Sequence, residues 1–207
     1  MPAKVKRQYS STLRQAQAQA TRSALVAAAA RLFIRHGYAV TTIDQIADAA
    51  GVSRATVFTS VGGKAALLKA AYDVAIVGDD APVALVERPR SREILAEQDP
   101  AKMLARYAGV ATEINARLAE LHVVLRGAAS ADPEARALWE TLQKQRRVGG
   151  DNLARPIAQK GRLKEGLDAR EAADLIWLLN DPGIYHTLVI ERGWAPSRYQ
   201  LWLSDAL

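Results

Sequence analysis

The 207-residue chain contains no cysteine. This absence excludes disulfide bridges, thiolate metal sites and cysteine nucleophiles. Long apolar runs are also missing. Because no stretch reaches about 18 apolar residues, the sequence predicts no membrane span. The basic start is not followed by an apolar segment, so we expect no signal peptide and a cytoplasmic location.

Signals for β-strands are scarce. Alanine and leucine dominate, alternation of β-branched residues is rare, and apolar residues recur at helical spacing, so the sequence predicts an all-α protein. An apolar fraction of 49% is ordinary for a folded chain. This length can bury a substantial core, either as one larger domain or as two domains of which one is small.

Positive charge is concentrated at one end of the chain. Residues 1–70 hold ten Lys and Arg against two Asp and no Glu, a net charge of +8, whereas residues 71–207 hold eighteen basic and twenty acidic side chains, a net charge of −2. A basic head on a near-neutral body is typical of a nucleic-acid-binding domain. The competing interpretation is that these charged side chains are merely exposed to solvent and bind no partner.

Residues 41–64, TTIDQIADAAGVSRATVFTSVGGK, predict two short helices joined by a tight turn. Thr42 is a suitable N-cap, and Gln45 three residues later completes a capping box. Gly51 ends the first helix because glycine accepts the left-handed backbone of a sharp turn. Ser53 caps the second helix. This layout predicts a helix-turn-helix, although any two short helices joined by a glycine share it.

The second helix would offer its outer face to the major groove of DNA. Its outward positions are Arg54, Ala55, Thr56, Phe58, Thr59 and Ser60. Arginine can read guanine, hydroxyl groups can meet bases or phosphate, and methyl groups can touch thymine. Lys64 starts the next helix, where a cation and free backbone N–H groups would suit a phosphate.

Two further segments complete the predicted head. Residues 1 to about 11 contain Lys4, Lys6 and Arg7 without apolar periodicity, which predicts a disordered arm along phosphate or in a minor groove. A helix then begins somewhere in 12–21 and ends at His36, with Gly37 as its left-handed cap. It supplies the third partner that two short helices need.

The rest of the chain shows repeated helix-start signals. These are Asp99-Pro100, Asp132-Pro133, Asp168 with Glu171, Asp181-Pro182 and Pro196. Residues 78–93 predict a loop, because two prolines and a mixed charge cluster interrupt the pattern. The segment after Pro133 contains Gly149-Gly150 and Pro156, and we expect the proline to kink or end its helix.

With this pattern laid out, the chain resembles the TetR family of transcriptional regulators. The segment ALVAAAARLFIRHGYAVTTIDQIADAAGVSRATVFTSVGGKAALLKA looks like the N-terminal domain of that family. The tail DPGIYHTLVIERGWAPSRYQLWLSDAL resembles the C-terminal helices of an actinobacterial-type branch. The resemblance implies a DNA-binding domain over residues 1–66 and a helical ligand-sensing and dimerisation domain over 67–207, with the fourth helix bridging the boundary.

The resemblance also implies a function. Members of the family are homodimers, and most repress transcription at an operator until a small-molecule effector releases them. A two-fold dimer implies a palindromic operator on double-stranded DNA. Residues that match the family's phosphate contacts are Thr42 and Lys64; those that match positions meeting bases or backbone are Arg54, Ala55, Thr56 and Thr59.

The chain departs from the family pattern at the recognition helix. Phe58 stands where the family usually has tyrosine, so a hydroxyl directed at phosphate is missing. Ser60-Val61 stands where an aromatic pair is usual. Because these departures shift the contact pattern, the operator sequence cannot be transferred from relatives.

The body residues suggest a ligand pocket and a dimer interface. Aromatic or polar-tipped candidates for the pocket are Tyr107, His122, Trp139 and Trp177. Segments 168–180 and 182–192 are capped and unusually apolar, and the resemblance places dimerising helices there. The candidate interface residues are Leu175, Leu179, Tyr185 and Leu188. The alternative for both sets is that they belong to the chain's own core.

Two rival functions are compatible with an all-helical chain. An enzyme is disfavoured because His36, His122 and His186 are scattered, and because Gly62-Gly63-Lys64 lacks the other residues of a phosphate-binding loop. No Gly-x-Ser-x-Gly elbow is present. We therefore expect no catalytic site, metal site or cofactor. The second rival is an all-helical protein–protein adaptor, or an activator, with a degenerate DNA-binding head.

Overall fold

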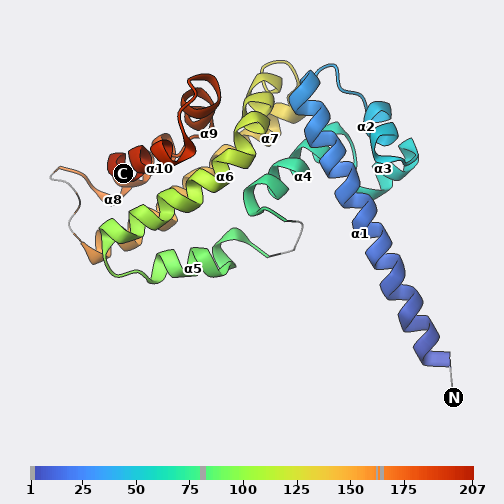
Figure 1. Cartoon of the computed structure of the whole chain (residues 1–207), viewed down its shortest axis with the longest axis horizontal. Coiled ribbons are helices and arrows are strands. Elements are labelled where there is room, and N and C mark those ends of the chain that lie inside the picture. Colours follow the sequence, from blue (N-terminus) through green and yellow to red (C-terminus); the bar gives the residue numbers. More distant parts are fainter. Residues whose placement is uncertain (1–2, 80–82, 162, 164–165) are drawn as a thin grey trace. The chain divides into compact units, whose positions relative to one another are not determined.

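The computed structural model describes residues 3–79, 83–161, 163 and 166–207, with side chains from Leu13 onward. The described residues are helical and contain no β-strand, which confirms the all-α prediction (Figure 1). The α-helices are α1 Ala3–His36, α2 Ile43–Ala50, α3 Arg54–Ser60, α4 Lys64–Val77, α5 Pro89–Ala96, α6 Pro100–Ala128, α7 Pro133–Lys160, α8 Ala169–Leu179, α9 Pro182–Tyr185 and α10 Pro196–Ala206. A 3₁₀ turn occupies Leu85–Glu87 and a π-helix occupies His186–Glu191. Over the described ranges, none of these helices has the length and apolarity needed to span a membrane.

The chain divides into two compact units, one ending at Asp73 and the other beginning at Val74. Helix α4 contributes residues to both units. The assignment of DNA binding to residues 1–66 and of ligand sensing to residues 67–207 stays a prediction.

The first unit is built on α1, which contacts both α2 and α3. Its core is apolar, and Leu25, Phe33, Ile46 and Val57 are completely buried. Gly37 closes α1 with a φ of +82°, as predicted. These contacts give the two short helices the support that neither could supply alone.

The predicted start of α1 is wrong. The helix begins at Ala3, so the segment expected to be a disordered arm has a helical backbone. Residues 3–36 contain neither glycine nor proline and are rich in alanine, glutamine and arginine, so nothing in the sequence stops the helix. Lys4, Lys6 and Arg7 lie on this helix, and their side chains fall outside the described ones.

The second unit is organised around the long helices α6 and α7. Helix α8 packs chiefly on α7, while α9 and α10 pack on α6. Two apolar clusters result. One is centred on Met103, Leu153 and Ile176, and the other on Tyr185, Tyr199 and Leu203.

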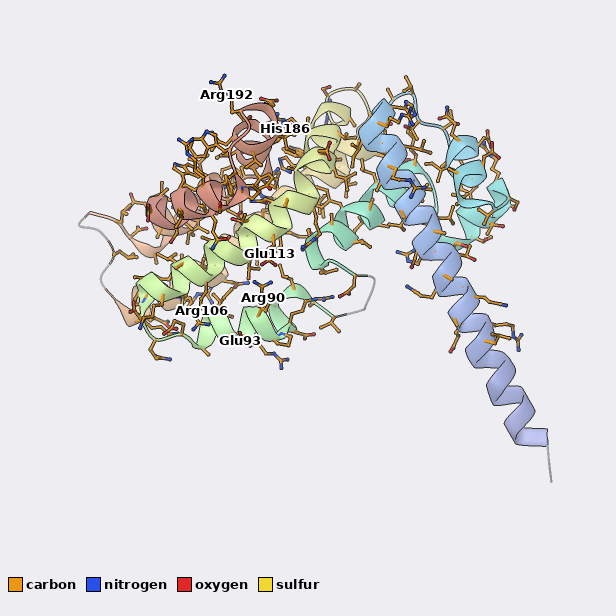
Figure 2. All side chains as sticks on the ribbon, in the orientation of Figure 1. Arg90, Glu93, Arg106, Glu113, His186 and Arg192 are labelled. Carbon is orange, nitrogen blue, oxygen red and sulfur yellow. The ribbon has the colours of Figure 1, made fainter. Side chains whose placement is uncertain are left out.

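The loop predicted over 78–93 is partly helical. Pro89 is the first residue of α5, where a missing N–H and a fixed φ suit a helix start. Arg90 of α5 pairs with Glu113 of α6, with 2.9 Å between Arg90 Nη2 and Glu113 Oε1 (Figure 2). Lys160 Nζ donates to the carbonyl oxygens of Leu95 and Glu97 at 2.6 and 2.7 Å. These contacts stabilise a short helix that the local pattern did not reveal.

Helix α7 continues through Pro156 to Lys160, so of the two outcomes expected for this proline it does not end the helix. Gly150 explains part of its stability. A Cβ atom at this position would lie 2.8 Å from the carbonyl oxygen of Ala173, so glycine lets α7 approach α8 closely. The extensive contact between these helices outweighs the local weakness that glycine and proline introduce.

The predicted helix over 182–192 starts correctly but changes its winding. Asp181 accepts from Gly183 N as the N-cap, with Pro182 in the first turn. From His186 the chain follows a π-helix, and His186 Nδ1 lies 3.2 Å from Glu191 Oε1, five residues on. Gly193 then closes the segment with a φ of +69°.

Candidate nucleic-acid interface

The caps predicted for α2 and α3 are present. Thr42 Oγ1 accepts from Gln45 N at 3.2 Å, and Thr42 N donates to Gln45 Oε1 at 2.9 Å. Gly51 ends α2 with a φ of +68°. Ser53 Oγ accepts from Thr56 N at 3.1 Å and so caps α3. The turn between the helices is therefore fixed at both ends by local bonds.

Two tertiary contacts hold this helix pair against α1. Thr41 is 1% exposed, and its hydroxyl donates to Gly37 O at 2.7 Å. Arg22 Nη1 donates to Ser60 O at 3.2 Å. Sequence reasoning missed both residues. Only Thr42 fitted a capping pattern. Thr41 bonds a carbonyl four residues back, outside that pattern, and the partner of Arg22 lies 38 residues away in the sequence.

Helix α3 presents one face to solvent. Arg54, Ala55, Phe58 and Thr59 are exposed on this face, while Val57 is completely buried on the opposite side. These positions follow the spacing of one helical face, and together they form what we call the α3 face. A short, exposed helix face that carries a cation and a hydroxyl group suits the major groove.

The other predicted contact residues border the α3 face. Thr42 and Ser53 are exposed at the two helix starts. Thr56 and Ser60 are half-buried, so they offer less surface than predicted. Thr59 is exposed, and its hydroxyl donates within the helix to Ala55 O at 3.1 Å. Their contacts with DNA stay predictions.

Both cations predicted to contact DNA already have partners within the chain. Arg54 Nη1 donates to both carboxylate oxygens of Asp44 at 2.8 Å, and its guanidinium lies 5.6 Å from the centre of the Phe58 ring. Lys64 Nζ donates to Ala39 O at 3.1 Å and lies 4.4 Å from the centre of the Tyr38 ring. Each cation is thus held in a defined position at the surface.

The ligand candidates of the second unit surround the turn between α8 and α9. Asn180 Nδ2 donates to the hydroxyl of Tyr107 at 2.7 Å. His122 is completely buried, and its ring centre lies 4.9 Å from that of Trp139. Arg146 Nη2 donates to the carbonyl oxygen of Trp177 at 2.9 Å. These contacts brace the chain's own core, so they give no direct support to a pocket formed by Tyr107, His122 and Trp139.

Asp181 is the charged centre of this polar network. His122 Nε2 lies 3.4 Å from Asp181 Oδ1, and Arg146 Nη1 lies 2.9 Å from Asp181 Oδ2. Burial alone would raise the pKa of the Asp181 carboxyl. The contact with His122, the charge of Arg146 and the bond from Gly183 N outweigh burial and lower its pKa to about 2. Burial raises the pKa of Tyr107 to about 12, so its hydroxyl stays protonated.

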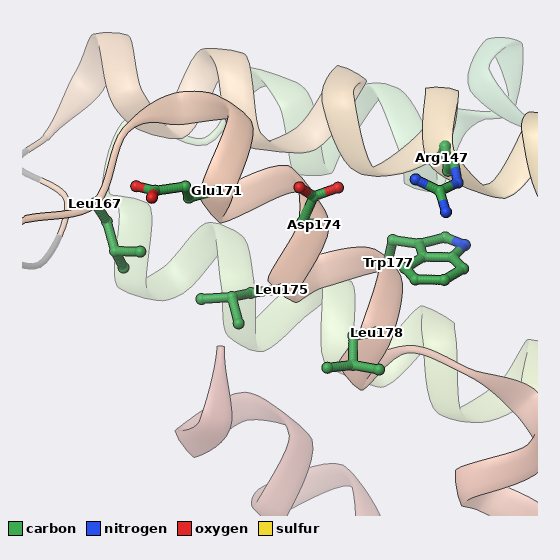
Figure 3. A pocket seen from close by; sticks show the side chains of 7 residues that line it. All are labelled: Arg147, Leu167, Glu171, Asp174, Leu175, Trp177 and Leu178. Carbon is green, nitrogen blue, oxygen red and sulfur yellow. The ribbon is translucent and has the colours of Figure 1, made fainter.

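A shallow depression of about 490 Å³ lies along α8. It is lined by Arg147, Leu167, Glu171, Asp174, Leu175, Trp177 and Leu178 (Figure 3). The Arg147 guanidinium lies 4.3 Å from the centre of the Trp177 ring. Trp177 is thus the one ligand candidate of the four that lines this depression.

The dimer candidates divide into two kinds. Leu175 is 42% exposed, as a contact residue should be, and its neighbour Leu178 is 53% exposed. Leu179 and Leu188 are half-buried against the chain's own core. Tyr185 is 3% exposed and packs edge-to-face on Tyr199, so its side chain has no surface left for a second copy. This burial disfavours Tyr185 as a contact residue, and Leu178 is an exposed neighbour that the sequence analysis did not name; the interface itself stays a prediction.

Comparisons with known proteins agree with this fold. Residues 25–71 match the family model of bacterial regulatory proteins, tetR family. The chain is 27% identical over 172 residues to YdeS, an uncharacterized HTH-type transcriptional regulator of Bacillus subtilis strain 168, covering 83% of this chain and 80% of that one.

Two solved structures share the fold. A protein of Pseudomonas aeruginosa PAO1 described as a transcriptional regulator has a TM-score of 0.68 at 19% identity, covering 89% of this chain and 87% of that one. A protein of Rhodococcus sp. described as a TetR-family transcriptional regulator has a TM-score of 0.66 at 16% identity, covering 91% and 96%.

The fold and the α3 face define a helix-turn-helix transcriptional regulator, not an enzyme. Within that class, residues 25–71 match the tetR family of bacterial regulatory proteins, and the chain shares its fold with a solved TetR-family regulator. The finer resemblance to an actinobacterial-type branch stays a prediction.

Proposed function

We propose that this regulator is a cytoplasmic repressor that binds a palindromic operator as a homodimer and is released by a small-molecule effector. The observation that carries DNA recognition is the α3 face. It combines a positioned arginine, exposed hydroxyl and methyl groups and an exposed aromatic ring on a helix that is capped and anchored to α1.

The apolar surface of α8 supports the homodimer. Leu175 and Leu178 are exposed on this helix, and Leu201 on α10 is 66% exposed. Exposed leucines such as these are typical of surfaces that a partner covers. One recognition helix reads only a few base pairs, whereas two heads in a symmetric dimer read a palindrome with enough specificity for a genome.

The depression along α8 is the candidate effector site. Its Trp177 ring and leucines offer apolar contact, and Glu171 and Asp174 add negative charge at its edge. Because Leu175 and Leu178 also belong to the proposed dimer surface, a ligand bound here would act on the association of two chains. That arrangement couples effector binding to the spacing of the two heads.

A selection of DNA fragments bound by the purified protein tests this function. We expect recovery of a sequence with two-fold symmetry, bound by two chains per duplex. Recovery of unrelated sequences, with affinity that depends on salt alone, would contradict operator recognition and favour the adaptor with a degenerate head.

A further inference from the structure

The contact between Asp44 and Arg54 has no evident role in stability. It joins α2 to α3, and both side chains are more than half exposed, at 63% and 58%. Exposed ion pairs of this kind contribute about 0–1 kcal/mol. A carboxylate beside the α3 face also repels phosphate, because both groups are negatively charged. This repulsion is unfavourable in a unit that is proposed to bind a polyanion. The place of Asp44 in the first turn of α2 suits the helix dipole, but this does not explain why it pairs with Arg54.

The geometry of the contact leaves part of the guanidinium available. Both oxygens of Asp44 are bonded to the same nitrogen, Nη1, at 2.8 Å. Among the described residues, Nη2 and Nε of Arg54 have no hydrogen-bond partner. These two nitrogens form one edge of the guanidinium, and two N–H groups on one edge are what a bidentate contact with guanine requires.

Phe58 restricts Arg54 from a second side. The guanidinium lies 5.6 Å from the centre of the Phe58 ring, one helical turn further along α3. An unrestrained arginine loses rotamer freedom when it binds. With an ion pair and an aromatic ring already fixing its position, Arg54 loses less of this freedom on reaching a base.

We propose that Asp44 is a specificity-determining residue, which orients the free Nε–Nη2 edge of Arg54 toward guanine and repels the phosphate backbone in non-specific complexes. Both effects widen the gap between specific and non-specific affinity. This proposal rests on the proposed DNA recognition by the α3 face. It adds a residue on α2 that touches no base and acts through Arg54.

The test compares Asp44→Asn with Asp48→Asn. Asp48 is exposed on the same helix one turn later and forms no described ion pair, so it controls for the loss of one negative charge. The base preference of each variant is measured by competition between the selected duplex and duplexes changed at single positions. A random duplex of equal length gives the non-specific affinity, and circular dichroism checks the fold.

We expect Arg54→Ala to lower the preference for guanine at one position by about fivefold or more. Asp44→Asn should lower the preference at that same position by about threefold or more and raise the affinity for the random duplex, while Asp48→Asn leaves the preference within about 1.5-fold. In the Arg54→Ala background, Asp44→Asn should cause no further loss of preference, because it acts through the arginine.

The outcomes separate this inference from the proposed function. If Arg54→Ala removes the preference while Asp44→Asn retains it, Asp44 has no role in specificity although the α3 face still reads DNA. If Asp44→Asn and Asp48→Asn have equal effects, the charge alone matters and orientation is refuted. If Arg54→Ala leaves every preference unchanged, base reading by Arg54 and the role of Asp44 fall together.

Discussion

The two units of this protein differ in whether a network of polar side chains enters the interior. In the first unit the ion pair of Arg54 and Asp44 lies at the surface, and the core of Leu25, Phe33 and Ile46 is apolar. In the second unit a polar network is buried around Asp181, while leucines on α8 and α10 are exposed.

This difference indicates what each surface can bind. Exposed cations suit a polyanion, and their contribution depends on salt. Exposed leucines gain free energy when a partner removes them from water, and that gain does not depend on charge. The comparison therefore supports our proposal that the first unit binds DNA and that the second unit binds an apolar partner, namely a second copy.

The largest expected effect is loss of the dimer. In Leu175→Glu/Leu178→Glu, a symmetric interface would bury carboxylates without partners, at a cost of several kcal/mol. The variant should sediment as a monomer with unchanged helical circular dichroism. Val86→Glu is the control, because Val86 is also an exposed apolar residue of the second unit and lies outside α8. A folded double variant that stays dimeric would place the interface elsewhere.

The pair Leu179→Glu/Leu188→Glu is not suited to this test. Both leucines pack partly against the core that contains Tyr185 and Tyr199. Glutamates there would damage the fold itself, so dissociation could not be assigned to the interface.

The next effect concerns the buried network. Asp181→Asn removes the partner of Arg146 and His122, so we expect a loss of about 2–4 kcal/mol in the free energy of unfolding, measured with urea. Asp174→Asn on α8 is the control, because its carboxyl is exposed and has no described ion pair. Equal stability of the two variants would show that the network contributes nothing.

Acid should weaken the same network. The pKa of Asp181 is about 2 in the folded chain, lower than the ordinary value of 3.8. A lowered pKa stabilises the folded state above the unfolded value, so this contribution, on the order of 2 kcal/mol, should be lost as the pH falls from about 4 to about 2. Comparing the acid unfolding of the wild type and Asp181→Asn checks this, since the variant should lose less stability over that interval. Identical pH profiles would contradict the assignment.

A smaller effect separates two adjacent glycines. A Cβ at Gly150 would meet the backbone of Ala173 at 2.8 Å, whereas one at Gly149 meets nothing within 4 Å. Gly150→Ala should therefore destabilise the chain by about 1–3 kcal/mol, and Gly149→Ala should stabilise it by up to about 1 kcal/mol. Thermal unfolding of both variants measures the difference. Stabilisation by both substitutions would show that α7 and α8 do not meet closely.

The smallest effect concerns Lys64. If it contacts one phosphate, Lys64→Ala should weaken binding to all sequences about equally and lower the slope of log affinity against log salt by about one unit. Lys69→Ala is the control, because Lys69 lies on the same helix and pairs with Asp73. A change in base preference would instead make Lys64 a reader of sequence.

Local signals predicted the first unit better than the second. Thr42, Gly51 and Ser53 act within a few residues of their own positions, so the sequence alone could place both short helices. Helix α5 and the length of α7 depend on distant partners, such as Lys160 and Ala173, which no local pattern reveals. The same reason explains why the burial of Tyr185 was not foreseen, since apolarity alone does not say which partner covers a side chain.

The sequence predicted which residues of the candidate interface point outward, but not the contacts that these residues make within the chain. Arg54 was recognised as an outward cation, whereas its contact with Asp44 required the crossing of α2 and α3. The start of α1 was missed because polar residues without apolar periodicity can still form a helix when nothing interrupts them.

A paired salt titration tests the comparison of the two units most directly. Affinity for the selected duplex and the dissociation constant of the dimer are measured on the same protein between about 50 and 500 mM salt. We predict that log affinity for DNA falls linearly with log salt, with a slope of about −3 or steeper, while the dimer is unchanged or strengthened. A flat DNA titration, or a dimer that weakens in parallel with DNA binding, would contradict the assignment of charged and apolar surfaces to these two partners.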